Sequence, residues 1–453
     1  MVHLLAAMLL LQDVDRVRVD PAGDVTLAPR NSVLRRQADP SKFDVITEMI
    51  VYRGRLIATA CMDFDETSIY QASAYSTEAQ LVEFLPDKGE WTVLREFQQS
   101  MLFNSRVIDG LLMVPEYFPM NDRSRRIHTF DGKEWGELGL LPQETWHIMD
   151  VLRIGDALYC SGSWRDLDPD ARQNDPNWMK GYGHVFESKD NGKTWKDIRR
   201  SKDNGRCLDM VEFKGRLYCN ERGFHLISWD GKAWTEIPVR FDGAKVDAKL
   251  GSAHLMTFAD RIVAINADLI YTYDGKKWTS AQPGYIDLWR EGNVLYGLRE
   301  DGHVASTTDA LKWTTVTTKE GVPAKEFDRQ ATKGRPIHRG AIAMHRGRLF
   351  VGTGAEGFIY AAAYEEKGSL TSKPEKIEAG AKLSLSWEAT AGVRLRWRSA
   401  ASQDDLAKAS WKDAAASPAE VAPAKKHRWV QWRADFEGDG AKSPVLRAVK
   451  LAP

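Results

Sequence analysis

The chain has 453 residues, too many for one compact core and enough for a large repeat domain with a smaller second domain. Its 63 Lys and Arg balance 63 Asp and Glu, so no net field draws nucleic acid or an anionic membrane to it, and we expect neither partner. No apolar run approaches about 18 residues, which excludes a membrane-spanning helix. The 16 Trp and 13 Tyr suit either packing or sugar stacking.

Residues 1–12, MVHLLAAMLLLQ, are mostly apolar but have no preceding Lys or Arg and no A-x-A-like cleavage site. They are either the remnant of a signal peptide or a first buried segment. The first alternative would place the protein outside the cell or in the periplasm.

A repeat organises residues 40 to 365. Seven segments alternate apolar and polar residues around a turn with Gly, Asp or Asn, as in MIVYRGRLIATA and MVEFKGRLYCNE, which predicts seven β-hairpins. Six further segments read as a strand, an Asp/Gly turn and a strand opened by Trp, at positions 91, 135, 195, 234, 278 and 313.

One segment of each kind supplies four short strands, the composition of one propeller blade. The last hairpin, near 342–351, lacks a Trp strand, and a strand from residues 15–28 could complete its blade. We therefore predict an all-β protein with a β-propeller of seven blades over residues 13–365, with six blades as the alternative.

One turn, SKDNGKTW, has Ser188, Asp190, Gly192, Thr194 and Trp195 in the spacing S-x-D-x-G-x-T-W. It resembles the Asp-box, or BNR, repeat of sialidase-like propellers. The resemblance implies a structural turn between the two outer strands of a blade, on the face opposite the usual ligand site.

Residues 366–453 no longer follow the repeat. We read EEKGSLTSKPEKIEAGAK as a polar linker and the alternating segments after it, such as VRLRWRSA, as strands of a small β-sandwich. The sandwich resembles the accessory domains of secreted glycan-active propellers, which implies either a carbohydrate-binding module or a spacer.

The four cysteines, Cys61, Cys160, Cys207 and Cys219, show no spacing typical of zinc, and we expect all four to be small buried residues. We expect no metal and no cofactor.

Two long insertions, at 116–126 and 161–184, fall on the face opposite the Asp/Gly turns and mix aromatic with cationic side chains. Such a mixture suits a sugar that bears carboxylate or sulfate. The alternative is that the aromatic residues of these loops only cover a neighbouring blade. With the loops that lead into the inner strands, they predict these substrate-binding residues: Trp146, Trp164, Arg165, Trp178, Tyr182, Arg335, His338 and Arg339.

The residue types of His147, Arg206, His254 and Tyr285 suit catalysis. A sialidase would need an arginine cluster and a Tyr nucleophile, but the sequence has no typical N-terminal arginine motif. A polysaccharide lyase would need a cation beside the sugar carboxylate and a His or Tyr to move the C5 proton. Aligned on the hairpin turns, the inner strands also place Glu48, Asn104, Asp150, Asp209, His254 and Asp287 at similar offsets, which predicts a polar ring that lines the channel.

These observations predict a monomeric extracellular or periplasmic propeller that binds an anionic glycan. Whether it also cleaves the glycan, as a hydrolase or a lyase, stays open. The alternative is a non-catalytic propeller that binds or scaffolds proteins. An enzyme should gather the four catalytic candidates in one concave pocket, whereas a scaffold should carry a broad aromatic patch.

Overall fold

The computed structural model describes residues 11–19, 24–37, 41, 45–61, 78–85, 90–98, 102, 104–116, 125–142, 145–165, 181–201, 207–221, 225–238, 240–241, 244–245, 254–266, 269–283, 285–327, 340–354 and 357–453. It divides into two compact units. The propeller unit comprises Arg36–His345 and Leu349–Ala361, and the terminal unit comprises Met1–Arg35, Arg346–Arg348 and Ala362–Pro453.

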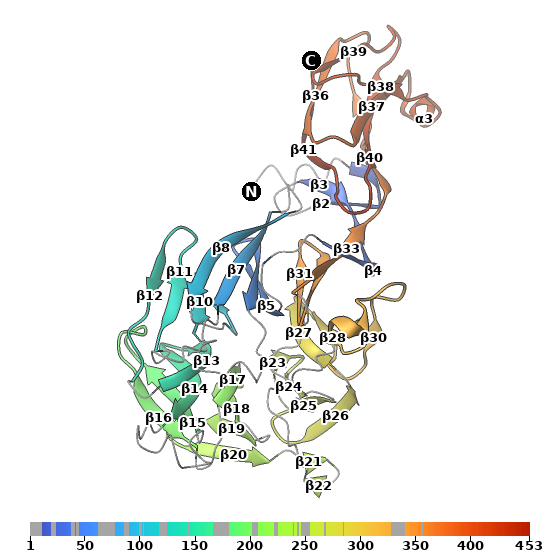
Figure 1. The fold of residues 1–453 in the computed structure, drawn as a ribbon. Helices are drawn as coiled ribbons and strands as arrows, with labels where there is room; N and C mark the ends of the chain where they lie inside the picture. The colour runs from blue at the N-terminus through green and yellow to red at the C-terminus, as the bar shows by residue number, and fades with distance from the viewer. Residues whose placement is uncertain are drawn as a thin grey trace. The chain divides into compact units, whose positions relative to one another are not determined.

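The described residues form seven four-stranded antiparallel sheets, which we number in chain order (Figure 1). Sheets 1 to 3 are β5 (Val45–Tyr52), β6 (Arg55–Cys61), β7 (Glu78–Leu85) and β8 (Glu90–Gln98); β9 (Arg106–Ile108), β10 (Leu111–Pro115), β11 (Ile127–Phe130) and β12 (Trp135–Glu137); and β13 (Thr145–Ile154), β14 (Ala157–Arg165), β15 (Gly181–Ser188) and β16 (Lys196–Arg200).

Sheets 4 to 6 are β17 (Cys207–Phe213), β18 (Arg216–Glu221), β19 (His225–Trp229) and β20 (Trp234–Pro238); β23 (Leu255–Phe258), β24 (Arg261–Asn266), β25 (Leu269–Tyr273) and β26 (Trp278–Pro283); and β27 (Tyr285–Glu291), β28 (Val294–Arg299), β29 (Val304–Thr307) and β30 (Thr314–Thr315). Sheet 7 is β31 (Gly340–His345), β32 (Arg348–Thr353), β33 (Ile359–Tyr364) and β4 (Pro29–Arg36). A two-stranded hairpin, β21 (Arg240–Phe241) and β22 (Ala244–Lys245), and a short helix, η2 (Ala324–Glu326), lie between sheets in the chain.

The sheets surround a common axis, with the first strand of each nearest to it, and β31 of sheet 7 contacts β5 of sheet 1 (Figure 1). Apolar clusters fill the spaces between neighbouring sheets: Tyr52 and Phe130 pack together from sheets 1 and 2, and Phe84 and Phe350 from sheets 1 and 7. The structure confirms the predicted all-β class and the β-propeller.

The hairpin turns explain the glycines of the repeat. In the turn between β17 and β18, Lys214 has φ of 52° and Gly215 has φ of 75°, the two positive values that a type I′ turn requires. This turn matches the right-handed twist of the strands that it joins, so the Gly positions in the sequence set the hairpin register.

The strand that completes sheet 7 is not the predicted one. β4 pairs with β33, whereas the preceding segment 15–28 forms β2 (Val17–Val19) and β3 (Val25–Leu27), which join β41 (Val445–Ala452) in the terminal unit. Val17, Val25 and Leu27 are buried in the core of that unit, and this burial decides the pairing. The predicted boundary of the propeller at residue 13 is therefore wrong.

Two sheets make up the terminal unit around one apolar core. The first has the order β1 (Leu11–Asp15), β34 (Lys367–Ser372), β40 (Trp429–Glu437), β37 (Val393–Ala400) and β38 (Lys412–Asp413), with β35 (Glu375–Lys376) beside β40. The second has the order β2, β3, β41, β36 (Leu383–Ala389) and β39 (Ala419–Val421), and α3 (Gln403–Leu406) follows β37.

The expected linker contains two of these strands, β34 and β35. Leu370 of β34 is buried in the shared core, which gives the segment a packed face that its polar composition conceals.

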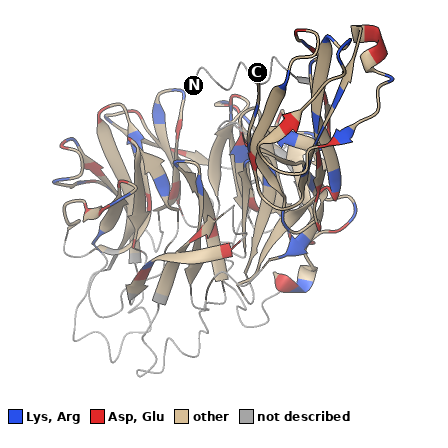
Figure 2. Cartoon of the chain, turned by 90° about the horizontal axis from the view of Figure 1, so that it is seen from above, with Lys and Arg blue, Asp and Glu red and all other residues tan. Residues whose placement is uncertain are grey.

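All four cysteines are buried, as expected, and they are thiols rather than members of disulfides. Burial raises the pKa of the Cys160 thiol well above its usual value, and that of Cys219 likewise. Basic and acidic residues are intermixed along the described chain (Figure 2), in keeping with the balanced charge of the sequence.

Candidate functional site at the propeller axis and the sheet 3 edge

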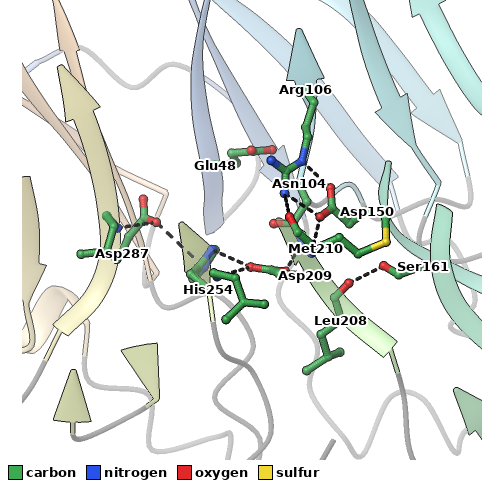
Figure 3. A network of polar contacts seen from close by, with 12 residues as sticks. Glu48, Asn104, Arg106, Asp150, Ser161, Leu208, Asp209, Met210, His254 and Asp287 are labelled. Carbon is green, nitrogen blue, oxygen red and sulfur yellow. Dashed lines mark hydrogen bonds and ion pairs between the residues drawn. The ribbon is translucent and has the colours of Figure 1, made fainter. Parts of the chain in front are cut away.

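The polar residues expected on the inner strands do meet near the axis (Figure 3). Glu48, Asp150, Asp209 and Asp287 lie on the inner strands of sheets 1, 3, 4 and 6, and Asn104 and His254 precede the inner strands of sheets 2 and 5. The matching offsets in the repeat predicted this cluster because the first strand of each blade faces the axis.

Each of the four carboxylates accepts a hydrogen bond from the backbone of the next sheet. The donors are the N–H groups of Ser105 to Glu48, Met210 to Asp150 at 2.7 Å, Leu255 to Asp209 at 3.1 Å, and Ile342 to Asp287 at 2.8 Å. These bonds connect consecutive sheets at their inner edges. The ring of carboxylates therefore has a structural role that does not depend on a ligand.

Arg106, on β9 of sheet 2, forms the ion pair at the centre of this cluster. Its Nε and Nη2 donate to the two carboxylate oxygens of Asp150, each at 2.6 Å, and Nη2 also donates to the carbonyl of Met210 at 2.8 Å. Burial alone would lower the pKa of Arg106, but Asp150 raises it, so the guanidinium stays charged. Arg106 was not among the predicted residues, although it lies only two positions after Asn104 and opens β9.

Burial has the opposite effect on the carboxylates. It raises the pKa of Asp150 to about 6, although Arg106 lowers it, and it raises the pKa of Glu48 well above its usual value. The pKa of Asp287 is also raised by burial, against the influence of His254. The region holds four acidic side chains against one guanidinium, so its described residues do not form a cationic site for an anionic sugar.

His254 lies between two of the acids. Its Nδ1 is 3.4 Å from Oδ2 of Asp209, and its Nε2 is 3.9 Å from Oδ1 of Asp287, while Asn104 donates to the other oxygen of Asp209. No group of three His, Cys, Asp or Glu side chains among the described residues is arranged to hold a metal ion.

Three of the four catalytic candidates lie within the described residues, and two of these are buried. His147 on β13 is fully buried, Tyr285 on β27 is 3% exposed, and His254 lies at the axis beside β23. The centres of the Tyr285 and Trp313 rings are 4.6 Å apart, and burial raises the pKa of the Tyr285 hydroxyl to about 12. Arg206 lies outside the described residues. The burial of His147 and Tyr285 speaks against a pocket that these two share with His254.

The substrate-binding candidates of sheet 3 share one edge of that sheet. The register places Trp164 opposite Tyr182 and Arg165 opposite Gly181, where β14 ends and β15 begins. Trp146 lies near the start of β13, at the same edge. Trp178, Arg335, His338 and Arg339 lie outside the described residues.

Arg200, which sequence analysis missed, completes this edge. It is the last residue of β16, pairs in register with His184, and holds its guanidinium 4.2 Å from the centre of the Tyr182 ring. A cation over an aromatic face is a favourable contact. Tyr182 is half-buried, so part of the stack is exposed. The sequence signal was the final Arg of KDIRR, at the end of an outer strand.

The turn 188–195 lies at the other edge of sheet 3. Asp190 accepts from the backbone N–H groups of Lys193 and Thr194 and from the Thr194 hydroxyl, and these bonds lower its pKa. Trp195 Nε1 donates to the carbonyl of Gly139, just after sheet 2, at 2.9 Å. Every fixed residue of the turn thus has a structural partner, so the turn holds the sheet and its neighbour together.

Exposed apolar residues are few. The large hydrophobic side chains that are exposed among the described residues are Val14, Val93, Val107 and Leu140, and none is aromatic. None of the helices formed by the described residues has the length and apolar character needed to cross a bilayer.

No protein-family model and no curated protein matches the sequence. Among solved structures, the chain is similar to YCF48 bound to a D1 peptide, with 13% identity and a TM-score of 0.46 over 73% of this chain and 94% of that one. It is also similar to YCF48 from Cyanidioschyzon merolae, with 11% identity and a TM-score of 0.43 over 73% and 98%.

A third similar structure is the extracellular domain of the hybrid two-component system BT4673 from B. thetaiotaomicron, with 10% identity and a TM-score of 0.46 over 80% of this chain and 44% of that one. At these identities and TM-scores, the ligands of these proteins do not carry over to this chain.

Proposed function

We propose that the protein binds an acidic polysaccharide or glycoconjugate at the sheet 3 edge, defined by Trp164, Arg165, Tyr182 and Arg200. The observation that carries the proposal is the register of β14 and β15 together with the Arg200 guanidinium stacked on Tyr182. An aromatic ring offers a stacking face for a sugar, and a guanidinium binds a carboxylate or sulfate in a bidentate manner.

The proposed site extends to loops that lead into the inner strands. Arg206 directly precedes β17 and Arg339 directly precedes β31 in the sequence, and we include Trp178, Arg335 and His338 with them as expected ligand contacts. Under this proposal, the three arginines among them supply positive charge to the ligand.

The proposal is one of binding without cleavage. His147 and Tyr285 are buried in different sheets, so neither of these two candidates is placed to reach a sugar together with His254. A hydrolase or lyase would need a different set of residues.

The finer assignments belong to the same proposal. We assign the propeller to the seven-bladed Asp-box type, supported by seven four-stranded sheets and by the hydrogen bonds of Asp190. We assign the terminal unit to an accessory β-sandwich, supported by its two sheets around one core. A monomer outside the cell or in the periplasm is the setting that fits an acidic polysaccharide.

The test is a calorimetric titration of the full chain with polyuronate, sulfated, sialylated and neutral oligosaccharides. We expect an acidic member to bind and Arg200→Gln and Tyr182→Ala each to weaken binding about tenfold. Lys196→Gln is the matched control, because Lys196 lies at the opposite end of β16. Absence of binding across the panel, or equal effects of Arg200→Gln and Lys196→Gln, would overturn the proposal; release of reducing ends or unsaturated products would overturn its non-catalytic part.

A further inference from the structure

An arginine-lined groove lies on the outward face of the first sheet of the terminal unit. Side chains on β37 alternate, so Leu395 and Trp397 enter the core while Arg394, Arg396 and Arg398 face away from it. On the neighbouring strand β40, Ala434 and Phe436 enter the core, and Arg433 and Asp435 share the outward face.

The strand register places two of these arginines directly opposite each other. Arg396 pairs with Arg433, and Arg394 pairs with Asp435. Like charges opposite each other in an antiparallel pair repel, so this juxtaposition calls for a negative group beside it. Neither arginine belongs to the apolar core, which lies on the other face of the sheet.

One carboxylate serves both guanidiniums. Asp435 accepts from Arg433 Nε at 2.7 Å and forms an ion pair with Arg396. Arg394 pairs instead with Asp413 of β38. Arg398 is already engaged, since its Nε and Nη2 donate to the Gln431 side chain and its guanidinium lies over the Trp411 ring. Arg394, Arg396 and Arg433 each form an ion pair with one carboxylate, and a guanidinium has five N–H donors, so each has donors beyond that pair.

These residues border a cavity of about 540 Å³, within the usual size of a small-ligand site. On the next strand, the short side chain of Ser369 lies beside Asp435 and that of Thr371 beside Arg433. Arg16 and Lys367 add two cations to the lining, against three acids, Asp15, Asp435 and Glu437. The lining thus has five cations, three acids and a formal charge of +2.

We infer that this groove is a second binding site, which takes the carboxylate or sulfate groups of an acidic oligosaccharide. A guanidinium presents two parallel N–H groups that match such an oxyanion, and three of them across two strands can hold successive charges of one chain. The choice of a saccharide as the carrier of these groups rests on the proposed function, whereas the oxyanion chemistry rests on the groove alone.

The first experiment uses the unaltered full chain. Its arginines are modified with phenylglyoxal, with and without polyuronate, sulfated or neutral oligosaccharides, and the modified sites are located by mass spectrometry. We expect the uronate or the sulfated ligand to protect Arg394, Arg396 and Arg433, the neutral one to protect none, and Arg447 on β41 to react equally throughout. Whichever of the two acidic ligands protects these arginines identifies carboxylate or sulfate as the preferred group.

The second experiment compares two double variants with the same change in charge. Arg396→Gln/Arg433→Gln should weaken binding about tenfold or more, since each charged hydrogen bond contributes about a tenfold factor. Lys382→Gln/Arg447→Gln, at the second sheet, should leave it unchanged. Because the first variant leaves Asp435 without partners, thermal denaturation accompanies the titration, and Arg394→Gln serves as a milder variant at an exposed side chain.

The outcomes separate the two proposals. Binding that persists without protection of the three arginines, or an equal loss in both double variants, overturns the groove and leaves the sheet 3 edge standing. Protection of the three arginines with no effect of Arg200→Gln or Tyr182→Ala supports the groove and overturns the sheet 3 edge. Failure of every acidic ligand to bind overturns both.

Discussion

Replacing Asp150 with Ala removes the acceptor of four hydrogen bonds at the propeller axis. Two come from Arg106 and two from the backbone N–H groups of Val151 and Met210. Removing one partner of a buried ion pair typically costs roughly 3–5 kcal/mol. The Arg106 side chain is 29% exposed, so water partly compensates its charge, and we expect a loss near the lower end, about 3 kcal/mol in the free energy of unfolding.

Equilibrium denaturation in urea, followed by tryptophan fluorescence at neutral pH, measures this loss. Asp156→Ala, in the exposed turn of the same sheet, is the control and should change stability by less than about 0.5 kcal/mol. Arg106→Met completes a double-mutant cycle, in which we expect a coupling of about 1–3 kcal/mol with Asp150→Ala. Additive effects, or an Asp150→Ala variant as stable as the control, would refute the structural role of the pair.

Three further predictions concern other parts of the propeller. Burial raises the pKa of Glu48 in the folded state above its unfolded value of about 4.5. The group therefore contributes stability that is complete below the unfolded pKa and is lost as pH rises through the folded pKa. Glu48→Gln should flatten that decline, and an unchanged slope of the denaturation midpoint against pH across this range would contradict the prediction. Trp195→Phe removes the hydrogen bond to Gly139 and should cost about 1 kcal/mol more than Trp278→Phe, whose Nε1 has no hydrogen-bond partner among the described residues; equal urea midpoints would count against the inter-sheet bond. The four buried thiols should resist a water-soluble disulfide reagent in the native protein and all react in denaturant, and prompt labelling of any one would show that its burial is wrong.

The sequence was informative wherever a residue type follows from local geometry. Gly215 and the corresponding glycines supply the positive φ of tight hairpin turns, which made the hairpins of the sheets recognisable. The pairing of β4 with β33 and of β3 with β41 was not predictable, because it depends on which distant apolar surface Val17, Val25 and Leu27 cover. A period of two identifies a strand and its buried face, but not its partner.

The candidate site also has features that were predictable from the sequence and features that were not. The offset from each hairpin turn predicted that Glu48, Asp150, Asp209 and Asp287 would meet near the axis. Their bonds to the next sheet were not predictable, because the donors are backbone N–H groups, which every residue except proline has. Arg106 was missed since a single basic residue in one repeat looks like an ordinary variation.

This difference between repeated and unrepeated residues bears on where a ligand binds. A carboxylate that recurs in several sheets and accepts the same inter-sheet bond is explained by the ring itself, so its presence at the axis is weak evidence for chemistry. Arg200 stacked on Tyr182, and Arg396 opposite Arg433, do not recur in the other sheets, so the repeat itself does not explain them. A ligand can explain an arrangement of side chains that the fold does not require. In this protein the two such arrangements, at the sheet 3 edge and in the groove of the terminal unit, are rich in arginine.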